Sequence, residues 1–185
     1  MMEDLEKDGC DFRLSMVLTP TLCTMLEDAL LQERYVEHLR GLIELSEKEL
    51  ERTKTSPEFH EVARMYNRKL TRCLEVYEDH YQRSLIRGLK HFQDLGKLEL
   101  ITCAATHAYL PLMKPTSKSV EAQIMIGRDH HEKIFGQPPK GIWLPECGFY
   151  PGLDEVIRQA GIRYFFVDTH AILFANKRPH YGVFA

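Results

Sequence analysis

The chain has 185 residues, of which 44% are hydrophobic and 28% charged, and its formal net charge is −3. This composition is ordinary for a globular domain that is large enough to bury one hydrophobic core. Acidic and basic residues are mixed without a long block of one sign, which argues against a nucleic-acid-binding protein. The apolar runs are far shorter than the roughly 20 residues that span a bilayer, so we expect no membrane partner.

The five cysteines are odd in number and scattered, and no two of them form a C-x-x-C pair. This spacing argues against a disulfide framework and favours a reducing compartment. The first residues, Met1-Met2-Glu3-Asp4, lack the basic and apolar segments of a secretory signal. We therefore expect a cytoplasmic protein.

The first half of the chain is predicted to be mainly helical. A strand is predicted over residues 12–18, and Pro20 stands where the first turn of a helix begins. Apolar residues then recur with helical spacing over residues 22–30, and a second helix is predicted over residues 35–50. Helical spacing returns over residues 62–92, where about nine turns pass without a proline. Gly96 follows at the position of a C-terminal cap. The pattern predicts a long helical hairpin.

After Gly96, short strands and helices alternate. Strands are predicted over residues 97–103, 141–144 and 162–167, and helices over residues 119–135 and 152–160. Strands joined by crossover helices pair in parallel, so the fold class is α/β. We divide the chain, residues 1–185, into a mainly helical segment (20–95) and a set of βα units (96–185).

Polar side chains follow each of the three late strands. They are His107 and Tyr109 after the first strand, Glu146 after the second, and Asp168 and His170 after the third. The C-terminal ends of parallel strands lie at one side of a sheet, where barrel enzymes carry their catalytic groups. We therefore expect these side chains to converge on one cleft.

Glu146 is the candidate catalytic residue. It follows the apolar run Ile142-Trp143-Leu144 and a proline, and it enters a turn that also holds Phe149. A carboxylate at a strand end, among aromatic rings that can stack on a sugar, favours carbohydrate chemistry. The alternative is a surface glutamate that pairs with Arg163 or Lys140.

The other candidates also have two interpretations each. Trp143 either stacks on a glucosyl unit or packs in the core. His107 either donates a hydrogen bond to a sugar hydroxyl and orients Glu146, or is satisfied by a backbone carbonyl in a turn. Asp168, two residues before His170, is more typical of a turn or a helix N-cap than of a catalytic group.

Asp129-His130-His131-Glu132 is the densest cluster of metal-ligand residue types. The segment lies within a predicted helix, where adjacent histidines diverge, so we interpret it as a solvated face. Helical zinc spacings such as H-E-x-x-H are absent, and so are the glycine-rich loops of nucleotide sites. We predict neither a metal site nor a cofactor.

Four blocks of sequence carry a resemblance to a known family. They are Leu18-Thr-Pro-Thr-Leu-Cys-Thr-Met-Leu-Glu-Asp28, Leu98-Glu-Leu-Ile-Thr-Cys-Ala-Ala-Thr-His-Ala-Tyr-Leu-Pro-Leu112, Gly141-Ile-Trp-Leu-Pro-Glu-Cys-Gly-Phe149 and Phe165-Phe-Val-Asp-Thr-His170. With the helical hairpin between the first two, they cover nearly the whole chain. The chain resembles glycoside hydrolase family 57, and most closely its branch of 1,4-α-glucan branching enzymes.

The resemblance implies a partial, distorted barrel of the (β/α)7 type with the helical hairpin inserted. By this resemblance Glu146 matches the catalytic nucleophile and His107 a histidine of the donor-sugar subsite. The predicted substrate-binding set is completed by Trp143, Tyr109, Asp168 and His170. The implied reaction is retaining: an α-1,4-glucan is cleaved through a covalent glucosyl-enzyme, and the segment is transferred to a 6-hydroxyl as a branch.

A retaining mechanism needs a second carboxyl about 5–5.5 Å from the nucleophile. The resemblance places that aspartate beyond residue 185, and it places the family's opening strand before residue 1. We therefore expect the chain to carry the middle of a catalytic domain. We also expect it to be inactive or nearly so on its own, and poorly soluble, because an open barrel leaves strand edges unpaired.

Two other α-glucan activities of the same superfamily remain open, those of a 4-α-glucanotransferase and of an amylase. A third alternative is a helical protein without catalysis that binds a partner or a glucan. A metal-dependent deacetylase is disfavoured because the ligand spacing is missing. The oligomeric state is not indicated by the sequence.

Overall fold

A computed structural model describes residues 2–178 of the chain. Its centre is a parallel sheet of four strands in the order β1-β2-β3-β4. The strands are β1 (Leu14–Val17), β2 (Leu98–Cys103), β3 (Gly141–Trp143) and β4 (Tyr164–Phe165). In the register, Val17 lies opposite Ile101 and Cys103 lies opposite Trp143. The predicted strands and their parallel pairing are confirmed.

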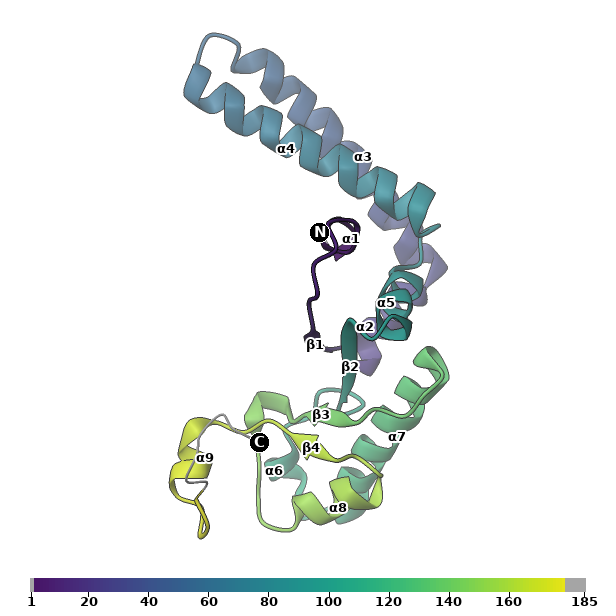
Figure 1. The fold of residues 1–185 in the computed structure, drawn as a ribbon, viewed down its shortest axis with the longest axis vertical. Helices are drawn as coiled ribbons and strands as arrows, with labels where there is room; N and C mark the ends of the chain where they lie inside the picture. The colour runs from purple at the N-terminus through teal and green to yellow at the C-terminus, as the bar shows by residue number, and fades with distance from the viewer. Residues whose placement is uncertain (1, 179–185) are drawn as a thin grey trace. The chain divides into compact units, whose positions relative to one another are not determined.

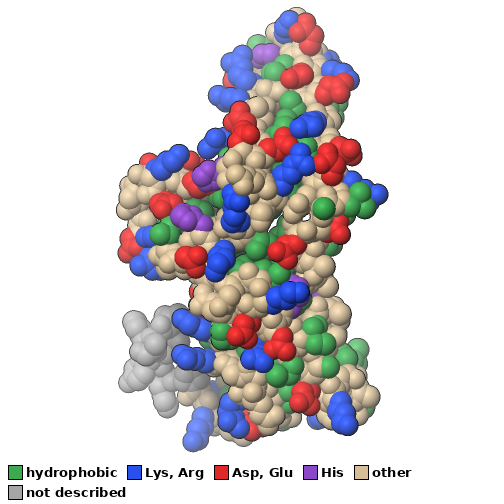
Figure 2. Space-filling view, turned by 90° about the vertical axis from the view of Figure 1, so that its right-hand side faces the viewer, with side chains coloured by type: hydrophobic (Ala, Val, Ile, Leu, Met, Phe, Trp, Pro, Cys, Tyr) green, Lys and Arg blue, Asp and Glu red, His purple; other side chains and the backbone are tan. Residues whose placement is uncertain are grey.

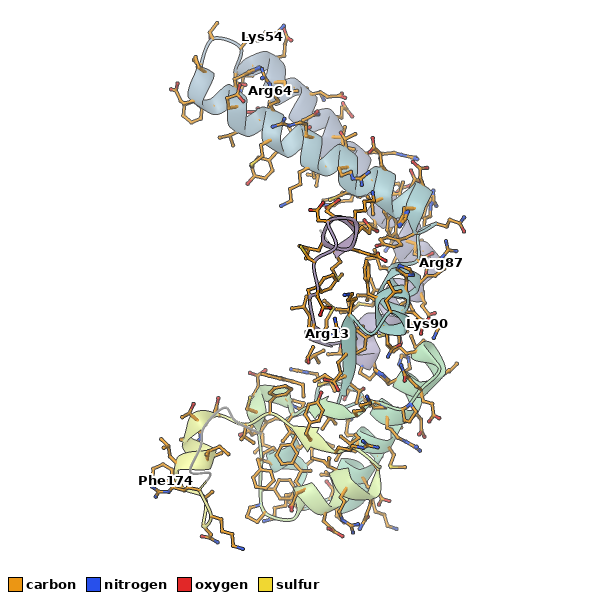
Figure 3. The ribbon with its side chains drawn as sticks, in the orientation of Figure 1. Arg13, Lys54, Arg64, Arg87, Lys90 and Phe174 are labelled. Carbon is orange, nitrogen blue, oxygen red and sulfur yellow. The ribbon has the colours of Figure 1, made fainter. Side chains whose placement is uncertain are left out.

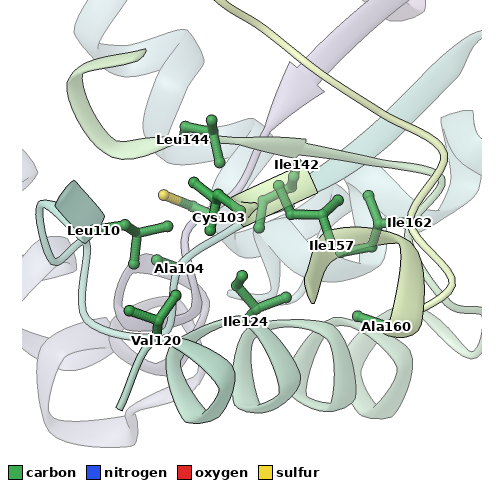
Figure 4. Close-up of a cluster of buried hydrophobic side chains, with 11 residues drawn as sticks. Cys103, Ala104, Leu110, Val120, Ile124, Ile142, Leu144, Ile157, Ala160 and Ile162 are labelled. Atoms are coloured by element: carbon green, nitrogen blue, oxygen red, sulfur yellow. The ribbon is translucent and has the colours of Figure 1, made fainter. Parts of the chain in front are cut away.

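Two crossover helices cover the sheet, α7 (Ser117–Phe135) and α8 (Leu153–Gln159). Figure 4 shows the core that they enclose with the strands, in which Val120 and Ile124 of α7 point toward Cys103 and Ile142. The strands β2 and β3 are nearly continuous in buried apolar residues, as expected for strands covered on both faces. The fold is the predicted α/β class, a part of a distorted barrel.

The chain divides into two compact units. The sheet unit combines the segment up to Cys23 with the segment from Gln93 onward, and the helical unit is Thr24–Phe92. The strand β1 therefore joins a sheet whose other members follow the helical unit in the sequence. The helical segment is inserted into the sheet unit.

The helical unit is built around a hairpin of α3 (Ala29–Arg52) and α4 (Pro57–Glu75), which run side by side in Figure 1. The shorter α2 (Pro20–Glu27) leads into it, and the side chain of Asp28 caps α3 by accepting a hydrogen bond from Leu31 N at 2.9 Å. Between the two long helices, Asn67 Nδ2 donates to the buried Ser46 Oγ at 2.9 Å. Figure 3 shows Lys54 and Arg64 near the end of the hairpin where α3 is joined to α4.

The structure corrects one prediction in this unit: the helical pattern over residues 62–92 is not one helix. The helix α4 ends at Glu75, a π-helix (Val76–His80) follows, and a new helix α5 (Leu85–Asp94) begins after a turn. In that turn Gln82 and Arg83 have φ values of 50° and 66°. The Arg83 guanidinium pairs with Glu33 and Glu78, and these ion pairs hold the break in place.

Three short helices were not predicted: α1 (Met2–Lys7), α6 (Leu110–Met113) and α9 (Thr169–Leu173). Each has six residues or fewer, too few for a periodic pattern. The predicted cap at Gly96 is confirmed, because this residue has a φ of 68° just after α5. Figure 2 shows acidic and basic side chains interspersed over the visible face. Among the described helices, none has the length and hydropathy needed to cross a membrane.

Candidate active site

His107 and Glu146 meet beyond the C-terminal ends of two neighbouring strands. β2 ends at Cys103 and β3 ends at Trp143, and these two residues lie opposite one another in the sheet. The chain needs only a few more residues on each side to bring the two side chains together. His107 Nε2 lies 3.4 Å from Glu146 Oε1. The predicted convergence is confirmed for this pair.

The loop that carries His107 is attached to α7 through one glutamine. Gln123 Oε1 accepts a hydrogen bond from Thr106 N at 2.9 Å, and Gln123 Nε2 donates to Thr106 Oγ1 at 2.8 Å. The carbonyl of Gln123 also accepts from Ala105 N at 2.9 Å. His107 itself has a φ of 56°, and its N–H donates to Ala104 O at 3.0 Å. The imidazole is therefore held at the rim of the sheet by backbone geometry.

The loop that carries Glu146 is a tight turn of 3₁₀ type (Pro145–Cys147). Both Glu146 and Cys147 have a φ of 53°, in the left-handed region that most residues avoid. Cys147 N donates to Leu144 O at 2.8 Å, and Gly148 N donates to Pro145 O at 3.0 Å. These bonds compensate the strained backbone and turn the carboxylate outward.

Tyr109 lies where the two loops touch. A Cβ atom built on Gly148 would lie 2.6 Å from Tyr109 Cε2 and 3.0 Å from Pro111 Cδ. The glycine therefore lets the Glu146 loop pack directly on the segment that follows His107. Tyr109 is 45% exposed, so it remains accessible beside the pair.

The site is open to solvent on one side and dry on the other. The Glu146 side chain is 78% exposed and the His107 side chain 43%. Behind them, the Cys103 thiol is fully buried, and its Sγ lies 3.2 Å from His107 Nδ1. Burial, together with the negative charge of Glu146, raises the pKa of Cys103 to about 11. The pKa of Cys147 is also raised, by burial first and then by the charges of Asp168 and Glu146.

Trp143, Asp168 and His170 complete the predicted set. Trp143 is half-buried and packs against the core, and its ring centroid lies 5.8 Å from that of Phe166. Asp168 occupies the N-cap position of α9, and His170 is exposed in the first turn of that helix. Among the described residues, no hydrogen bond or ion pair joins these three side chains to Glu146 or His107.

Three alternatives from the sequence can be compared with this geometry. In the described part of the chain, Glu146 pairs with His107 and with neither Arg163 nor Lys140. Asp168 lies at the N-cap position that its helix N-cap interpretation expects, although in the described residues its side chain makes no capping hydrogen bond. The core-packing interpretation of Trp143 agrees with its contacts, and its partly exposed ring leaves the stacking interpretation open.

The interpretation of the Asp129–Glu132 segment as a solvated face was wrong at His131. This side chain is 3% exposed and its ring tilts against Phe135, with centroids 4.8 Å apart. Within residues 2–178, neither ring nitrogen has a hydrogen-bond partner. Burial, and secondarily the neighbouring His130, lowers the pKa of His131 to about 4. Among residues 2–178, no cluster of three or more metal-ligand side chains occurs.

Two residues of the site were missed by sequence reasoning. Cys103 was interpreted only as the end of a strand, although the sequence places it four residues before His107. Gln123 gave no signal, because a polar residue in an amphipathic helix is normally solvated. Its role depends on where α7 crosses the sheet.

Comparison with known proteins places this geometry in a family. Residues 4–185 match the family model described as glycosyl hydrolase family 57. A 1,4-alpha-glucan branching enzyme of Thermococcus kodakarensis is 32% identical over an alignment of 185 positions, which covers 92% of this chain and 27% of that protein. A 4-alpha-glucanotransferase of Thermococcus litoralis is 25% identical over 60% of this chain and 19% of its own length.

Solved structures of similar proteins agree with this family match. The alpha-amylase AmyC from Thermotoga maritima matches 95% of this chain and 34% of its own, with 46% identity and a TM-score of 0.89. A GH57-type branching enzyme from Pyrococcus horikoshii matches 96% of this chain and 36% of its own, with 30% identity and a TM-score of 0.85. This chain spans about a third of each structure. The family match over almost every residue leads to one conclusion: the chain belongs to glycosyl hydrolase family 57.

Proposed function

We propose that the chain carries the nucleophile half of a retaining α-glucan transferase site, with Glu146 as the nucleophile. The observation that supports this most directly is the pairing of an exposed carboxylate with an imidazole at 3.4 Å, at the ends of adjacent parallel strands. A nucleophile must be reachable by a large substrate, and Glu146 is the more exposed of the two. The proposed substrate is an α-1,4-glucan, and no cofactor is required.

The proposed chemistry follows from these positions. A Glu146 oxygen attacks C1 of the donor glucosyl unit, and the bond from C1 to the leaving oxygen breaks. That oxygen takes a proton from an acid/base carboxyl, which the family resemblance places outside this chain. His107 holds the attacking carboxylate in place. In a second displacement an acceptor hydroxyl attacks C1, its proton passes to the acid/base carboxylate, and the ester bond to Glu146 breaks. This restores the α-configuration and frees Glu146.

The acceptor decides between the activities in this family. We propose branching, in which a glucan 6-hydroxyl is the acceptor, because named branching enzymes match 92% and 96% of the chain. Hydrolysis, with water as acceptor, is the second candidate, because the amylase AmyC has 46% identity. Tyr109, Trp143, Asp168 and His170 are proposed to contact the glucan around the pair.

Trapping tests the nucleophile on this chain directly. A 5-fluoro-α-maltosyl fluoride reacts without an acid catalyst, because fluoride leaves with its electron pair and needs no proton. We expect a covalent maltosyl ester on Glu146, identified by peptide mass spectrometry. Glu146→Gln should abolish the label, since an amide is a poor nucleophile. The matched control Glu121→Gln, an exposed glutamate of α7, should label normally.

An unlabelled wild-type chain that still binds maltooligosaccharide would refute the proposal and support a glucan-binding module. Label on another residue, undiminished in Glu146→Gln, would refute the assignment of the nucleophile.

Product analysis separates branching from hydrolysis. A fusion in which this chain replaces the aligned third of Thermotoga maritima AmyC is incubated with amylose, and the products are examined by proton NMR and a reducing-end assay. We expect α-1,6 linkages to accumulate faster than reducing ends. Reducing ends without α-1,6 linkages would favour the amylase alternative. Unmodified AmyC serves as the control.

A further inference from the structure

Three side chains form a line from the core to the surface of the site. Cys103 Sγ lies 3.2 Å from His107 Nδ1, and His107 Nε2 lies 3.4 Å from Glu146 Oε1. The two contacts use opposite nitrogens of the same ring. The first member is fully buried and the last is 78% exposed.

We propose that Cys103 is a positioning residue whose thiol donates a hydrogen bond to His107 Nδ1 and thereby holds the Nε2–H of that ring on Glu146. The catalytic consequence rests on the proposed role of Glu146 as nucleophile. The hydrogen-bond arrangement itself does not.

The direction of each bond follows from which groups can donate. In a neutral imidazole one nitrogen donates and the other accepts. An ionised carboxylate only accepts, so Nε2 must carry the proton that faces Glu146. Nδ1 is then an acceptor, and the Cys103 thiol is the donor beside it. The thiol keeps its proton because burial raises its pKa to about 11.

The position of the sulfur is set by the fold. Cys103 is the last residue of β2 and pairs with Trp143 of β3. In Figure 4 its sulfur points toward the side of the core where Leu110 and Leu144 lie, which are the residues that flank the two site loops. A ring held by a buried donor cannot turn its lone pair toward Glu146 without breaking that bond.

The competing interpretation treats Cys103 as a small apolar residue that fills the core. The two interpretations differ for serine and alanine replacements. Serine keeps a donor at the same place, whereas alanine keeps only an apolar group. If Cys103 only fills the core, Cys103→Ser should perturb the site more than Cys103→Ala. If its thiol is a hydrogen-bond donor, Cys103→Ala should perturb the site more.

The tautomer of His107 is the readout that packing alone would not change. It is measured by ¹⁵N NMR of the histidine rings in the 185-residue chain, at about pH 8.5, where an ordinary histidine is neutral. The His107 signal is assigned by its loss in His107→Gln. The exposed His38 of α3 gives the reference for an unrestrained ring.

The test compares Glu146→Ala alone with Glu146→Ala combined with a change at Cys103. Once the carboxylate is removed, we expect the thiol alone to keep His107 in the Nε2–H form. Adding Cys103→Ala should bring the tautomer ratio to that of His38, whereas Cys103→Ser should preserve the Nε2–H form. The matched control Cys23→Ala, also buried, should leave the ratio unchanged.

Two results would overturn the inference. One is an Nδ1–H ring in the wild-type chain, which would make the sulfur an acceptor. The other is a ratio in Glu146→Ala that already equals the ratio in the Cys103→Ala double variant.

A rate measurement then connects the thiol to the proposed chemistry. We expect Cys103→Ala to slow maltosyl labelling of Glu146 about fivefold to tenfold, the ratio for one lost hydrogen bond of ordinary strength. Cys103→Ser should restore the rate. If no variant labels at all, the proposed function fails, but the tautomer result still decides the role of the thiol. If labelling is equally fast in wild type and Cys103→Ala, the positioning role fails and the nucleophile stands.

Discussion

At the scale of single residues, three positions of the site have a strained backbone. His107, Glu146 and Cys147 all have positive φ values without being glycines. Each such residue costs on the order of 1–3 kcal/mol and persists only where the surroundings enforce it. The hydrogen bonds of Gln123 and of the Leu144–Gly148 turn provide that enforcement. Strain concentrated on the two facing residues is typical of a functional site.

His131 predicts a pH dependence of stability. Its pKa is lowered to about 4 in the folded chain, whereas an unfolded histidine has a pKa near 6.5. Above about pH 6.5 the ring is neutral in both states and full stability is present. As the pH falls toward 4, only the unfolded state binds the proton, so we expect up to about 3 kcal/mol of stability to be lost.

Urea unfolding at about pH 7.5 and about pH 5 measures this loss. His131→Leu should reduce the difference between the free energies of unfolding at the two pH values. It should not lower the free energy of unfolding at pH 7.5, because among the described residues the ring has no hydrogen-bond partner to lose. An unchanged pH dependence in His131→Leu would contradict the assignment of the effect to this residue.

At the scale of elements, the contact between α7 and β2 positions the site. Gly127 of α7 lies against the end of β2, and its carbonyl accepts a hydrogen bond from the buried Thr102 Oγ1 at 3.0 Å. One turn earlier, Gln123 holds the loop that carries His107. The same helix therefore fixes both the buried strand end and the loop beyond it.

Gly127→Ala is expected to destabilise the chain by about 1–3 kcal/mol, the usual cost of overpacking. A Cβ atom at this position would lie 2.3 Å from the carbonyl oxygen of Cys103, which is backbone and cannot move aside. The matched control is Gly41→Ala in α3, where a Cβ atom would have no described atom within 4 Å apart from its own stretch of helix backbone. That change should stabilise its helix by up to about 1 kcal/mol.

Thermal melts followed by circular dichroism compare the two glycine variants. Equal melting temperatures for Gly127→Ala and wild type would show that α7 can withdraw from β2. The close approach would then not be needed to hold the loop.

At the scale of the whole chain, the sheet unit carries the candidate site and the helical unit is inserted into it. Glu146, His107 and Cys103 all belong to residues 93–185, and so does the helix that anchors them. In the described residues β1 and β4 are the edge strands of the sheet. At the C-terminal side, Phe174, which is labelled in Figure 3, is 82% exposed. The chain spans 27% of the curated branching enzyme and about a third of the solved structures.

The periodicity of the sequence was sufficient for most elements. Strands over residues 97–103 and 141–144, and helices over 119–135 and 152–160, agree with the structure within about three residues. His131 shows where a local pattern misleads. The four polar residues of the segment 129–132 suggested a solvated face. His131, however, lies seven positions after Ile124, on the buried stripe of α7. The stripe, rather than the local composition, decides burial.

What the sequence determined by itself is the strands and most of the longer helices, the parallel order of the strands, and the placement of Glu146 and His107 just after neighbouring strands. These follow from local periodicity and from the rule that crossover-linked strands share one C-terminal edge. The break at Arg83 and the burial of His131 were decided by contacts between elements far apart in the chain. So was the line from Cys103 through His107 to Glu146, because a separation of 3.2–3.4 Å depends on how strands pair and loops pack, which no local pattern records.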